Sequence, residues 1–393
     1  MHNRYSTLLL LLAALAVASL TACDQSEQNI DFGPGNSLTI NGPSAAFAPG
    51  GSATFQVRAF TLNKNYDWSV DGPGEVSTNV RQEGEYLDAT FDEPGTYTVS
   101  VTGTGEGDEY TGSTTIVVSY PDVVTQAGRQ GFGTLGTALG AAGLTDALAS
   151  GGPFTVFAPT DEAFAAFLDD EDDGVDMGDL PAESVLSDIL QYHVVPDSLP
   201  ASQLSGSAAT LEGAELTFEG SGENVTVLDG TDLTDPAAVT NANVPASNGL
   251  IHAIDALRLP PTASVAFDDQ PSADSVTVTV RSVYVPRNGY VAIHDSTLLD
   301  DPPQVAGSVI GVSEYREAGL YNNLEVELFD VPGAGFPADT TLQGDQLLIA
   351  MPHEETNMNE EYNFITSDGD EDGAYTEGGS AVVDPGFVTV GEN

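Results

Sequence analysis

The sequence predicts a multidomain protein with an N-terminal β-sandwich, a central α+β domain and a C-terminal all-β domain. Its 393 residues are enough for two or three domains. Short runs of alternating apolar and polar residues, typical of strands, fill residues 37–120 and 262–393. Leucines at helical spacing occur between them, in residues 121–261. We therefore place the domain boundaries at 37–120, 121–261 and 262–393.

The N-terminus predicts export and a lipid anchor. His2 and Arg4 precede an apolar run of about 13 residues, whereas a membrane span needs roughly 20. The run ends in Leu-Thr-Ala-Cys, which resembles the lipobox of bacterial lipoproteins. The resemblance implies a signal peptide over 1–22, acylation of Cys23 and a polar tether over 23–36. Cys23 is the single cysteine, so an intramolecular disulfide is excluded.

The composition is strongly acidic. The chain has 60 Asp and Glu residues against 9 Lys and Arg residues, and its net charge is -51. A nucleic acid is excluded as a partner because its phosphates would be repelled. Self-repulsion would largely vanish in about 1 M salt, where the Debye length is roughly 3 Å. The composition therefore favours a salt-loving host.

Residues 37–120 are predicted to form short strands. Alternation in ATFQVRAF is followed by YDWSV, YLDATF, TYTVSVTG and STTIVVSY, with a turn at 93–95. We expect Trp68 to pack in the core rather than to form an exposed ligand platform. The stretch FDEPGTYTVSVTG resembles PKD-type Ig-like domains, which implies a corner tyrosine at Tyr97 and a spacer role.

Residues 121–261 are predicted to mix helices and strands. FGTLGTALGAAGLTDAL favours a pair of helices, and FTVFA favours a buried strand that ends at Pro159. Thr160 or Asp161 is a suitable N-cap for the next helix. SVLSDILQYHVVP predicts a helix passing into a strand, and ASNGLIHAIDALRLPP predicts a turn, a strand and a proline stop.

Three stretches of this region, FTVFAPTDEAF, YHVV and NGLIHAIDALRLPP, resemble the fasciclin domain in their order and spacing. The resemblance implies a compact α+β fold and an extracellular adhesion or matrix-contact role without catalysis. It also places Tyr192 and His193 at a pair discussed as integrin-contacting in animal relatives. We interpret His193 and His252 as core histidines bonded to the backbone, not as a metal or acid–base pair. The acidic run over 168–179 is predicted to be a solvated loop.

Residues 262–393 are predicted to form an all-β sandwich or barrel. SVTVTVRSVYV alternates from Val276, and Pro-Arg-Asn-Gly at 286–289 predicts a hairpin in which YVAIHD pairs back. LEVELF, DQLLIAMP and GFVTV are further candidate strands. VAIHD, GVSEYREAG, AMPHEETNMNEEYNF and AVVDPGFVTV resemble an uncharacterised domain of haloarchaeal surface proteins.

Two candidate metal sites lie in this last region. Asp368, Asp370 and Asp372 alternate as in the first half of an EF-hand loop, which makes them a candidate calcium site. Position twelve is Gly379, so other oxygens would have to complete the site. In so acidic a chain, the sequence favours the alternative that the run is a solvated loop. His294, Met351, His353 and Met358 carry side chains that copper binds, but the sequence favours a chance grouping. The sequence thus predicts no cofactor apart from a candidate calcium ion.

The sequence predicts a non-catalytic, lipid-anchored protein of the cell envelope. It would bind an extracellular protein or polysaccharide through the fasciclin domain and the membrane through its lipid. No hydrolase elbow, zinc motif, phosphate loop or dinucleotide fingerprint is present. Two alternatives stay open: an envelope enzyme such as a glycan hydrolase, and a purely structural surface spacer.

Overall fold

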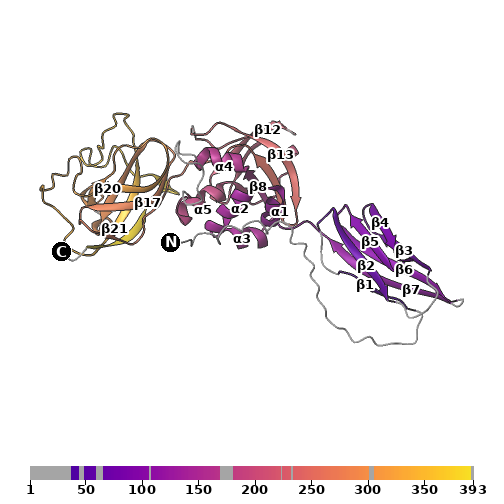
Figure 1. The fold of residues 1–393 in the computed structure, drawn as a ribbon. Coiled ribbons are helices and arrows are strands. Elements are labelled where there is room, and N and C mark those ends of the chain that lie inside the picture. The colour runs from indigo at the N-terminus through magenta and orange to yellow at the C-terminus, as the bar shows by residue number, and fades with distance from the viewer. Residues whose placement is uncertain are drawn as a thin grey trace, which may run out of the picture.

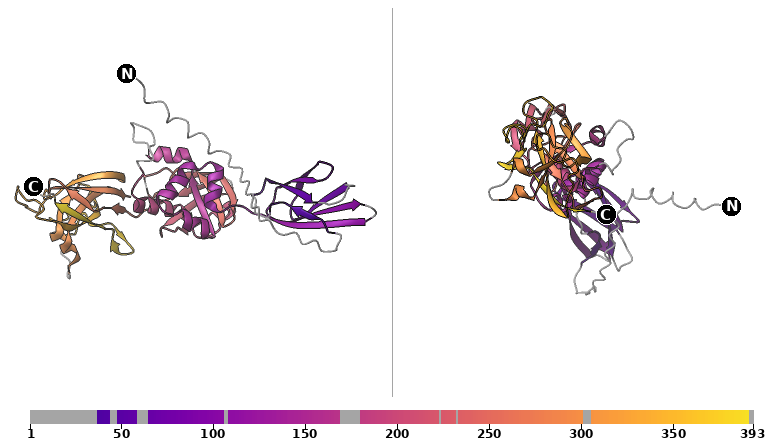
Figure 2. Two further views of the ribbon diagram at one scale, coloured as in Figure 1. Left: turned by 60° about the horizontal axis from the view of Figure 1, so that its bottom comes forward. Right: turned by 90° about the vertical axis from the view of Figure 1, so that its left-hand side faces the viewer.

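A computed structural model describes residues 37–43, 48–58, 65–105, 108–168, 180–222, 224–231, 233–300 and 305–390. Three units follow one another in chain order, and the central one lies between the other two (Figure 1). Figure 2 shows the same order from two further sides. Cys23 and residues 169–179 of the acidic run lie outside the described residues, so the predictions made for them stay predictions.

The N-terminal unit is a sandwich of two antiparallel sheets. Its strands are β1 (Thr39–Asn41), β2 (Gly51–Arg58), β3 (Asn65–Asp71), β4 (Val76–Arg81), β5 (Tyr86–Phe91), β6 (Gly95–Gly105) and β7 (Asp108–Val118). One sheet has the order β1-β2-β5-β4 and the other β3-β6-β7. Alternating apolar residues of these strands, including Phe55, Leu87 and Val99, fill the space between the sheets.

Two aromatic side chains of this sandwich behave as the sequence predicts. Tyr97 is fully buried, and its hydroxyl donates to the Glu93 carbonyl oxygen over 2.9 Å, which is the corner contact. Trp68 packs against the core while its indole N–H donates to the Gly84 carbonyl at 2.7 Å. Trp68 is half-buried and is held at the edge of the core by this contact.

The central unit combines a curved mixed sheet with a layer of helices. Its elements are α1 (Val123–Gln130), α2 (Gly133–Ala141), α3 (Thr145–Ser150), β8 (Phe154–Pro159), α4 (Asp161–Leu168), α5 (Glu183–Tyr192), β9 (Val194–Val195), η2 (Ala201–Gln203), β10 (Gly206–Ala209), β11 (Glu215–Ser221), β12 (Asn224–Leu228), β13 (Ala237–Ala246) and β14 (Gly249–Ile254). The sheet order is β10-β11-β12-β13-β14-β8-β9, and β8 runs parallel to β14. The helices gather on one side of this sheet (Figure 1).

The strand-to-helix corner at FTVFAPTDEAF forms as predicted. Every residue of β8 is buried, and Pro159 ends the strand. The Thr160 hydroxyl accepts from the Ala163 backbone N–H at 3.2 Å, so Thr160 caps α4. Asp161 and Glu162 occupy the first turn, where the helix dipole favours negative charge.

The third unit is a second β-sandwich. Its elements are β15 (Ser264–Ala266), β16 (Gln270–Ser272), β17 (Thr277–Val285), β18 (Gly289–Asp295), η3 (Ser296–Leu299), η4 (Ala306–Ser308), β19 (Val309–Val312), β20 (Gly319–Glu327), β21 (Gln346–Glu354), β22 (Thr376–Glu377), β23 (Ser380–Ala381) and β24 (Asp384–Val390). The sheet β15-β17-β20 packs on the sheet β16-β24-β21-β18-β19 through a largely aliphatic core.

The predicted hairpin between β17 and β18 is wrong. β17 pairs with β15 and β20, whereas β18 pairs with β19 and β21 in the opposite sheet. A tight two-residue turn would need residues with positive φ, and none of residues 286–288 has one. Gly289 instead permits a close strand approach, because a Cβ there would lie 2.0 Å from the His353 carbonyl oxygen.

The central and third units share part of one core. Ala266 and Tyr284 of the third unit are buried in the hydrophobic cluster of the central unit. The Ser282 hydroxyl accepts from the Ala182 backbone N–H at 2.7 Å, and the Tyr284 hydroxyl donates to the Pro260 carbonyl at 2.8 Å. α5 therefore packs against the sheet that carries β15 and β17.

Candidate functional site

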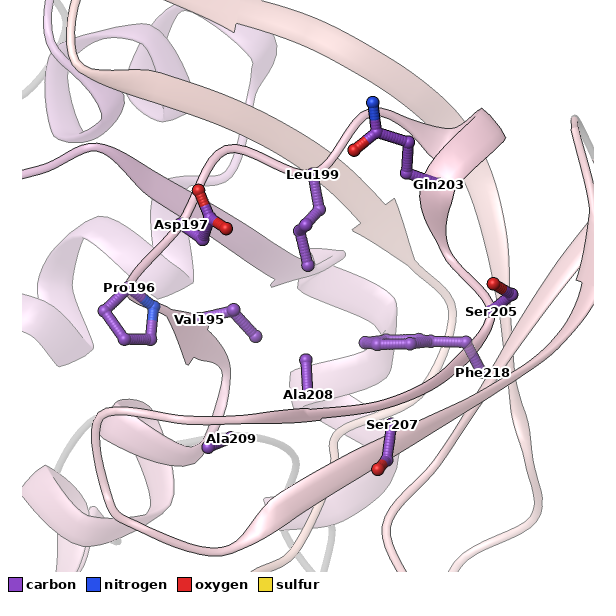
Figure 3. Close-up of a pocket in the computed structure, with 10 residues that line it drawn as sticks. All are labelled: Val195, Pro196, Asp197, Leu199, Gln203, Ser205, Ser207, Ala208, Ala209 and Phe218. Atoms are coloured by element: carbon purple, nitrogen blue, oxygen red, sulfur yellow. The ribbon is translucent and has the colours of Figure 1, made fainter.

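A recess of about 280 Å³ opens where the two ends of the central sheet approach each other (Figure 3). One wall follows β9 and the segment after it, and the other is the edge strand β10 with Phe218 of β11 behind it. The lining residues are Val195, Pro196, Asp197, Leu199, Gln203, Ser205, Ser207, Ala208, Ala209 and Phe218. Val195 ends the YHVV stretch and Pro196 follows it, whereas the sequence did not single out the other lining residues.

Hydrogen bonds to backbone groups hold the two walls in place. The Thr155 hydroxyl donates to the Asp197 carbonyl at 2.7 Å and accepts from the Leu199 N–H at 2.8 Å, which fixes the turn after β9. The Leu211 N–H donates to the Val194 carbonyl at 2.7 Å and so joins the β10–β11 connection to β9. These hydrogen bonds therefore fix the shape of the recess.

The chemistry of the recess is that of a binding surface. Val195, Leu199, Ala208 and Phe218 point toward its interior, and polar Ser and Gln side chains lie at its rim (Figure 3). Asp197 is the one ionisable residue among the lining residues, and its carboxylate accepts from the Ser198 N–H at 2.7 Å. General acid–base catalysis needs at least one positioned proton donor or acceptor beside a reacting group, and a hydrolase of the two-carboxyl type needs a pair. The recess offers no such pair.

His193 and His252 are core histidines, as predicted. His193 donates through Nδ1 to the Ile189 carbonyl at 2.7 Å, and its Nε2 accepts from the Arg258 N–H at 2.9 Å. His252 donates through Nε2 to the Leu199 carbonyl at 2.9 Å and accepts at Nδ1 from the Asn243 N–H at 3.3 Å. Both nitrogens of each ring are occupied, and burial lowers both pKa values, that of His193 to about 4.

The Tyr192–His193 pair lies inside the domain. The two residues are 0% and 1% exposed, so neither side chain can contact a partner. The Tyr192 hydroxyl donates to the carbonyls of Glu215 and Asp229 at 2.9 and 2.8 Å. The pair therefore ties α5 to the strands.

A buried ion pair sits beside it. Arg258 Nη1 lies 3.5 Å from Asp229 Oδ2, with both side chains nearly inaccessible. Asp229 also accepts from the hydroxyls of Thr231 and Thr234 and from the Leu259 N–H. The Asp229 carboxylate is thus satisfied by further hydrogen bonds. We therefore assign the buried ion pair a structural role.

Asp188 is the carboxyl with the most raised pKa among the described residues. Burial raises its pKa to about 6, and the negative charges of Glu212 and Glu377 add to the shift. It lies on α5 at the junction with the third unit, outside the recess described above. A raised carboxyl pKa is typical of general acids, but here the packing of two units accounts for it.

The predicted calcium residues do not come together as a ligand group. Asp368 and Asp370 are exposed, whereas Asp372 is fully buried. The Asp372 carboxylate accepts from the backbone N–H groups of Thr356 and Asn363 at 3.1 and 2.6 Å. Within the described residues no group of three or more His, Cys, Asp or Glu side chains could hold a metal ion. Calcium binding stays a prediction, and Asp372 has a structural use.

A second recess of about 740 Å³ opens beside β20 of the third unit. It is strongly polar, and its charged lining residues are Glu314, Arg316, Glu325, Glu327 and Asp330. Arg316 Nη2 lies 4.0 Å from Glu314 Oε2, and the guanidinium lies over the Tyr321 ring. This recess is the larger of the two, and Val312, Tyr321 and Leu324 are among its other lining residues.

Comparison with known proteins places each unit in a family. Residues 130–260 match the Fasciclin domain, residues 37–118 match the PKD domain, and residues 263–389 match a Domain of unknown function, DUF7282. A Synechocystis protein, sll1483, is 44% identical over 151 residues, which are 35% of this chain and 73% of that protein. The chain belongs to the fasciclin-domain family. The fold predicted for each of the three units is confirmed.

Two further relatives of this fasciclin-domain protein are named for the cell surface. Cell surface glycoprotein 2 of Haloarcula hispanica is 35% identical over 246 residues, which are 59% of this chain and 23% of that protein. Cell surface glycolipoprotein MPB83 of Mycobacterium bovis is 33% identical over 119 residues, 30% of this chain and 48% of that protein. The chain thus spans less than half of each surface protein. Among its described helices, none is both long and apolar enough to cross a membrane.

Proposed function

We propose that this protein is a lipid-anchored, non-catalytic surface protein that attaches cells to an extracellular protein through its fasciclin domain. The recess between β9 and β10 carries the proposal, since it is a built concave surface without an acid–base pair. The surface names of the haloarchaeal and mycobacterial relatives support the location. The predicted acylation of Cys23 supplies the anchor.

The edge strand β10 suits an extended peptide. β10 ends its sheet, so one side of its backbone lacks a strand partner within the described residues. Its sequence, GSAA, has small side chains that let another backbone approach. A peptide added along β10 would gain main-chain hydrogen bonds and could place one apolar side chain over Leu199 and Phe218.

The variant Ala208→Glu tests the recess. Ala208 is half-buried and points into it, so a glutamate there fills the space and charges it. We expect cells carrying the variant to lose most of their surface attachment, measured as adherent or aggregated cells. Ala238→Glu is the matched control, because Ala238 is an exposed residue of β13 in the same sheet. Equal attachment by both variants, with unchanged melting temperatures, would favour the spacer alternative.

The variant Cys23→Ser tests the anchor. The serine hydroxyl cannot form the thioether that holds the lipid, so we expect the variant in the soluble or secreted fraction. More than one acyl chain holds a protein stably on a membrane, whereas none gives no hydrophobic anchor. The measurement is the membrane-bound fraction after a salt wash. Retention of Cys23→Ser in that fraction would contradict the proposal.

The enzyme alternative rests on the carboxylates of the second recess. A glycan hydrolase needs two carboxyl groups on opposite sides of the scissile bond. Glu325 and Glu327 lie in that recess, both on β20. Release of reducing ends from envelope glycans by the wild-type protein, abolished in Glu327→Gln, would favour the enzyme over the adhesin.

A further inference from the structure

Two buried histidines of the third domain lie side by side on adjacent strands. His294 of β18 and His353 of β21 are both fully inaccessible, and their ring centres are 5.6 Å apart. The antiparallel register pairs Ala292 with Met351, and each histidine lies two residues from this pair. Side chains two residues apart on a strand share a face. His294, Met351 and His353 therefore lie on one face, with the small Ala292 among them.

Hydrogen bonds fix the tautomer of each ring. His353 Nδ1 lies 2.7 Å from the Asp372 carbonyl oxygen, which can only accept, so Nδ1 carries the proton. His294 Nδ1 lies 2.8 Å from the Ser308 hydroxyl, which already donates to the Val305 carbonyl at 2.9 Å. Nδ1 of His294 must therefore donate as well. Each neutral ring keeps a bare lone pair on Nε2.

Both Nε2 atoms are buried without a hydrogen-bond partner. A buried polar atom left unpaired costs free energy, and such atoms are rare in native proteins. Two buried nitrogen lone pairs on one face thus have no hydrogen-bond donor to pair with.

The spacing of the rings suits a shared metal ion. A metal–nitrogen bond is roughly 2.0–2.1 Å long, and the centre of the imidazole ring lies about 1.1 Å beyond the nitrogen. Two imidazoles on one metal ion therefore have ring centres roughly 5–6.3 Å apart, for nitrogen–metal–nitrogen angles from tetrahedral to linear. The observed 5.6 Å falls within this range. Metal-binding histidines also donate their other N–H to a carbonyl or hydroxyl, as both rings do here.

The other possible ligand atoms on this face indicate which metal ion would bind. Met351 is 3% exposed, and its thioether is the sulfur on this face. No third His, Cys, Asp or Glu joins a ligand group with the two histidines in the described residues. Soft thioether and imidazole donors without a carboxylate favour Cu(I), whereas zinc and calcium favour more ligands or harder ones.

We propose that His294, His353 and Met351 form a buried Cu(I)-binding site. For three of the four residues, this proposal departs from the chance grouping that the sequence favoured. Met358 is excluded, because it is 93% exposed on the segment after β21. That same segment supplies Tyr362 and Phe364, whose rings contact His353 and cover the site.

The test is a Cu(I) titration of the full-length protein against a coloured Cu(I) chelator, without oxygen and with ascorbate. The buffer contains about 1 M sodium sulfate, which screens the acidic surface without chloride that would complex Cu(I). We expect the wild type to withdraw one equivalent of Cu(I) from the chelator. His294→Phe and His353→Phe should withdraw none, and Met351→Leu should withdraw less.

Two kinds of control separate the site from a loss of folding. His252→Phe removes a histidine whose nitrogens are both bonded, and Met358→Leu removes the exposed thioether; both should keep the full equivalent. Ser308→Ala removes the acceptor that orients His294, so it should weaken Cu(I) affinity by roughly 10–100-fold without removing a ligand. Melting curves without copper show whether each variant folds.

X-ray absorption of the copper-loaded wild type gives a readout that needs no variant. We expect a first shell of two imidazole nitrogens and one sulfur. The proposal is overturned if the wild type leaves Cu(I) with the chelator, if the folded histidine variants bind as the wild type does, or if the shell contains only oxygen. Binding of one Zn²⁺ at these residues with no Cu(I) binding would overturn it too.

Discussion

Asp188 shows how one half-buried carboxyl makes stability depend on pH. Its pKa in the folded protein is raised to about 6 by burial and by Glu212 and Glu377, above the ordinary 3.8. The folded state therefore holds the proton more tightly than the unfolded state. Stability from this group is fully present below about pH 4 and is lost as the pH rises through about 6.

We expect Asp188→Asn to stabilise the protein at pH 7.5 and to have little effect at pH 4. The asparagine side chain stays uncharged, so it does not lose the free energy of folding that the aspartate loses when it ionises. The measurement is the difference in melting temperature between variant and wild type at the two pH values. A difference that is equal at both would show that the Asp188 charge is not the cause.

The histidines show which features could be predicted from the sequence and which could not. Apolar neighbours of His193 and His252 are enough to predict burial, and their backbone partners follow from the need to satisfy buried nitrogens. The site at His294 and His353 depends instead on Ser308 and on the Asp372 carbonyl. Those partners are set by the tertiary fold, so the tautomers could not be predicted.

Asn248 connects several elements of the fasciclin domain. Its side-chain oxygen accepts from the Val123 N–H at the start of α1 over 2.9 Å. Its amide donates to the carbonyls of Leu148 and Gly151 at the end of α3, both at 2.8 Å. One turn residue before β14 thus fixes the ends of two helices.

Asn248→Ala is expected to lower the free energy of unfolding by about 2–4 kcal/mol. The estimate takes about 0.5–1.5 kcal/mol for each of the three lost hydrogen bonds. Denaturant unfolding of the full chain measures it. Asn241→Ala, at an exposed position of β13, is the control and should change stability by less than about 0.5 kcal/mol. Similar losses from both substitutions would contradict the role of Asn248.

Elements were predictable where local pattern and tertiary use agree. Alternation in β2 and β6, and the helix start at Thr160, needed no knowledge of distant residues. The hairpin at 286–289 failed because Asn-Gly has two uses, a tight turn and a close strand approach, and only the fold distinguishes them. The recess escaped notice because β9 and β10 meet through sheet curvature, which local sequence does not encode.

At the scale of the whole molecule, charge is the dominant unusual feature. The net charge is -51, so carboxylates repel one another within the folded protein. Salt screens this repulsion. We expect the melting temperature to rise between about 0.1 and 2 M KCl, with most of the change below about 1 M, where the Debye length falls from roughly 10 Å to roughly 3 Å. An uncharged osmolyte such as sucrose is the control for general solute effects. A flat or falling curve in KCl would contradict the predicted adaptation to salt.

The first and last strands of the PKD sandwich touch in parallel. Ser37 bridges Thr111 of β7 in that direction, and the Leu38 N–H donates to the Thr111 carbonyl at 2.9 Å. A pull on the chain before Ser37 and after Val118 would drag these two segments past each other lengthwise. Such shear strains neighbouring hydrogen bonds together, whereas peeling would break them one after another. The domain is thus arranged to resist tension applied along the chain.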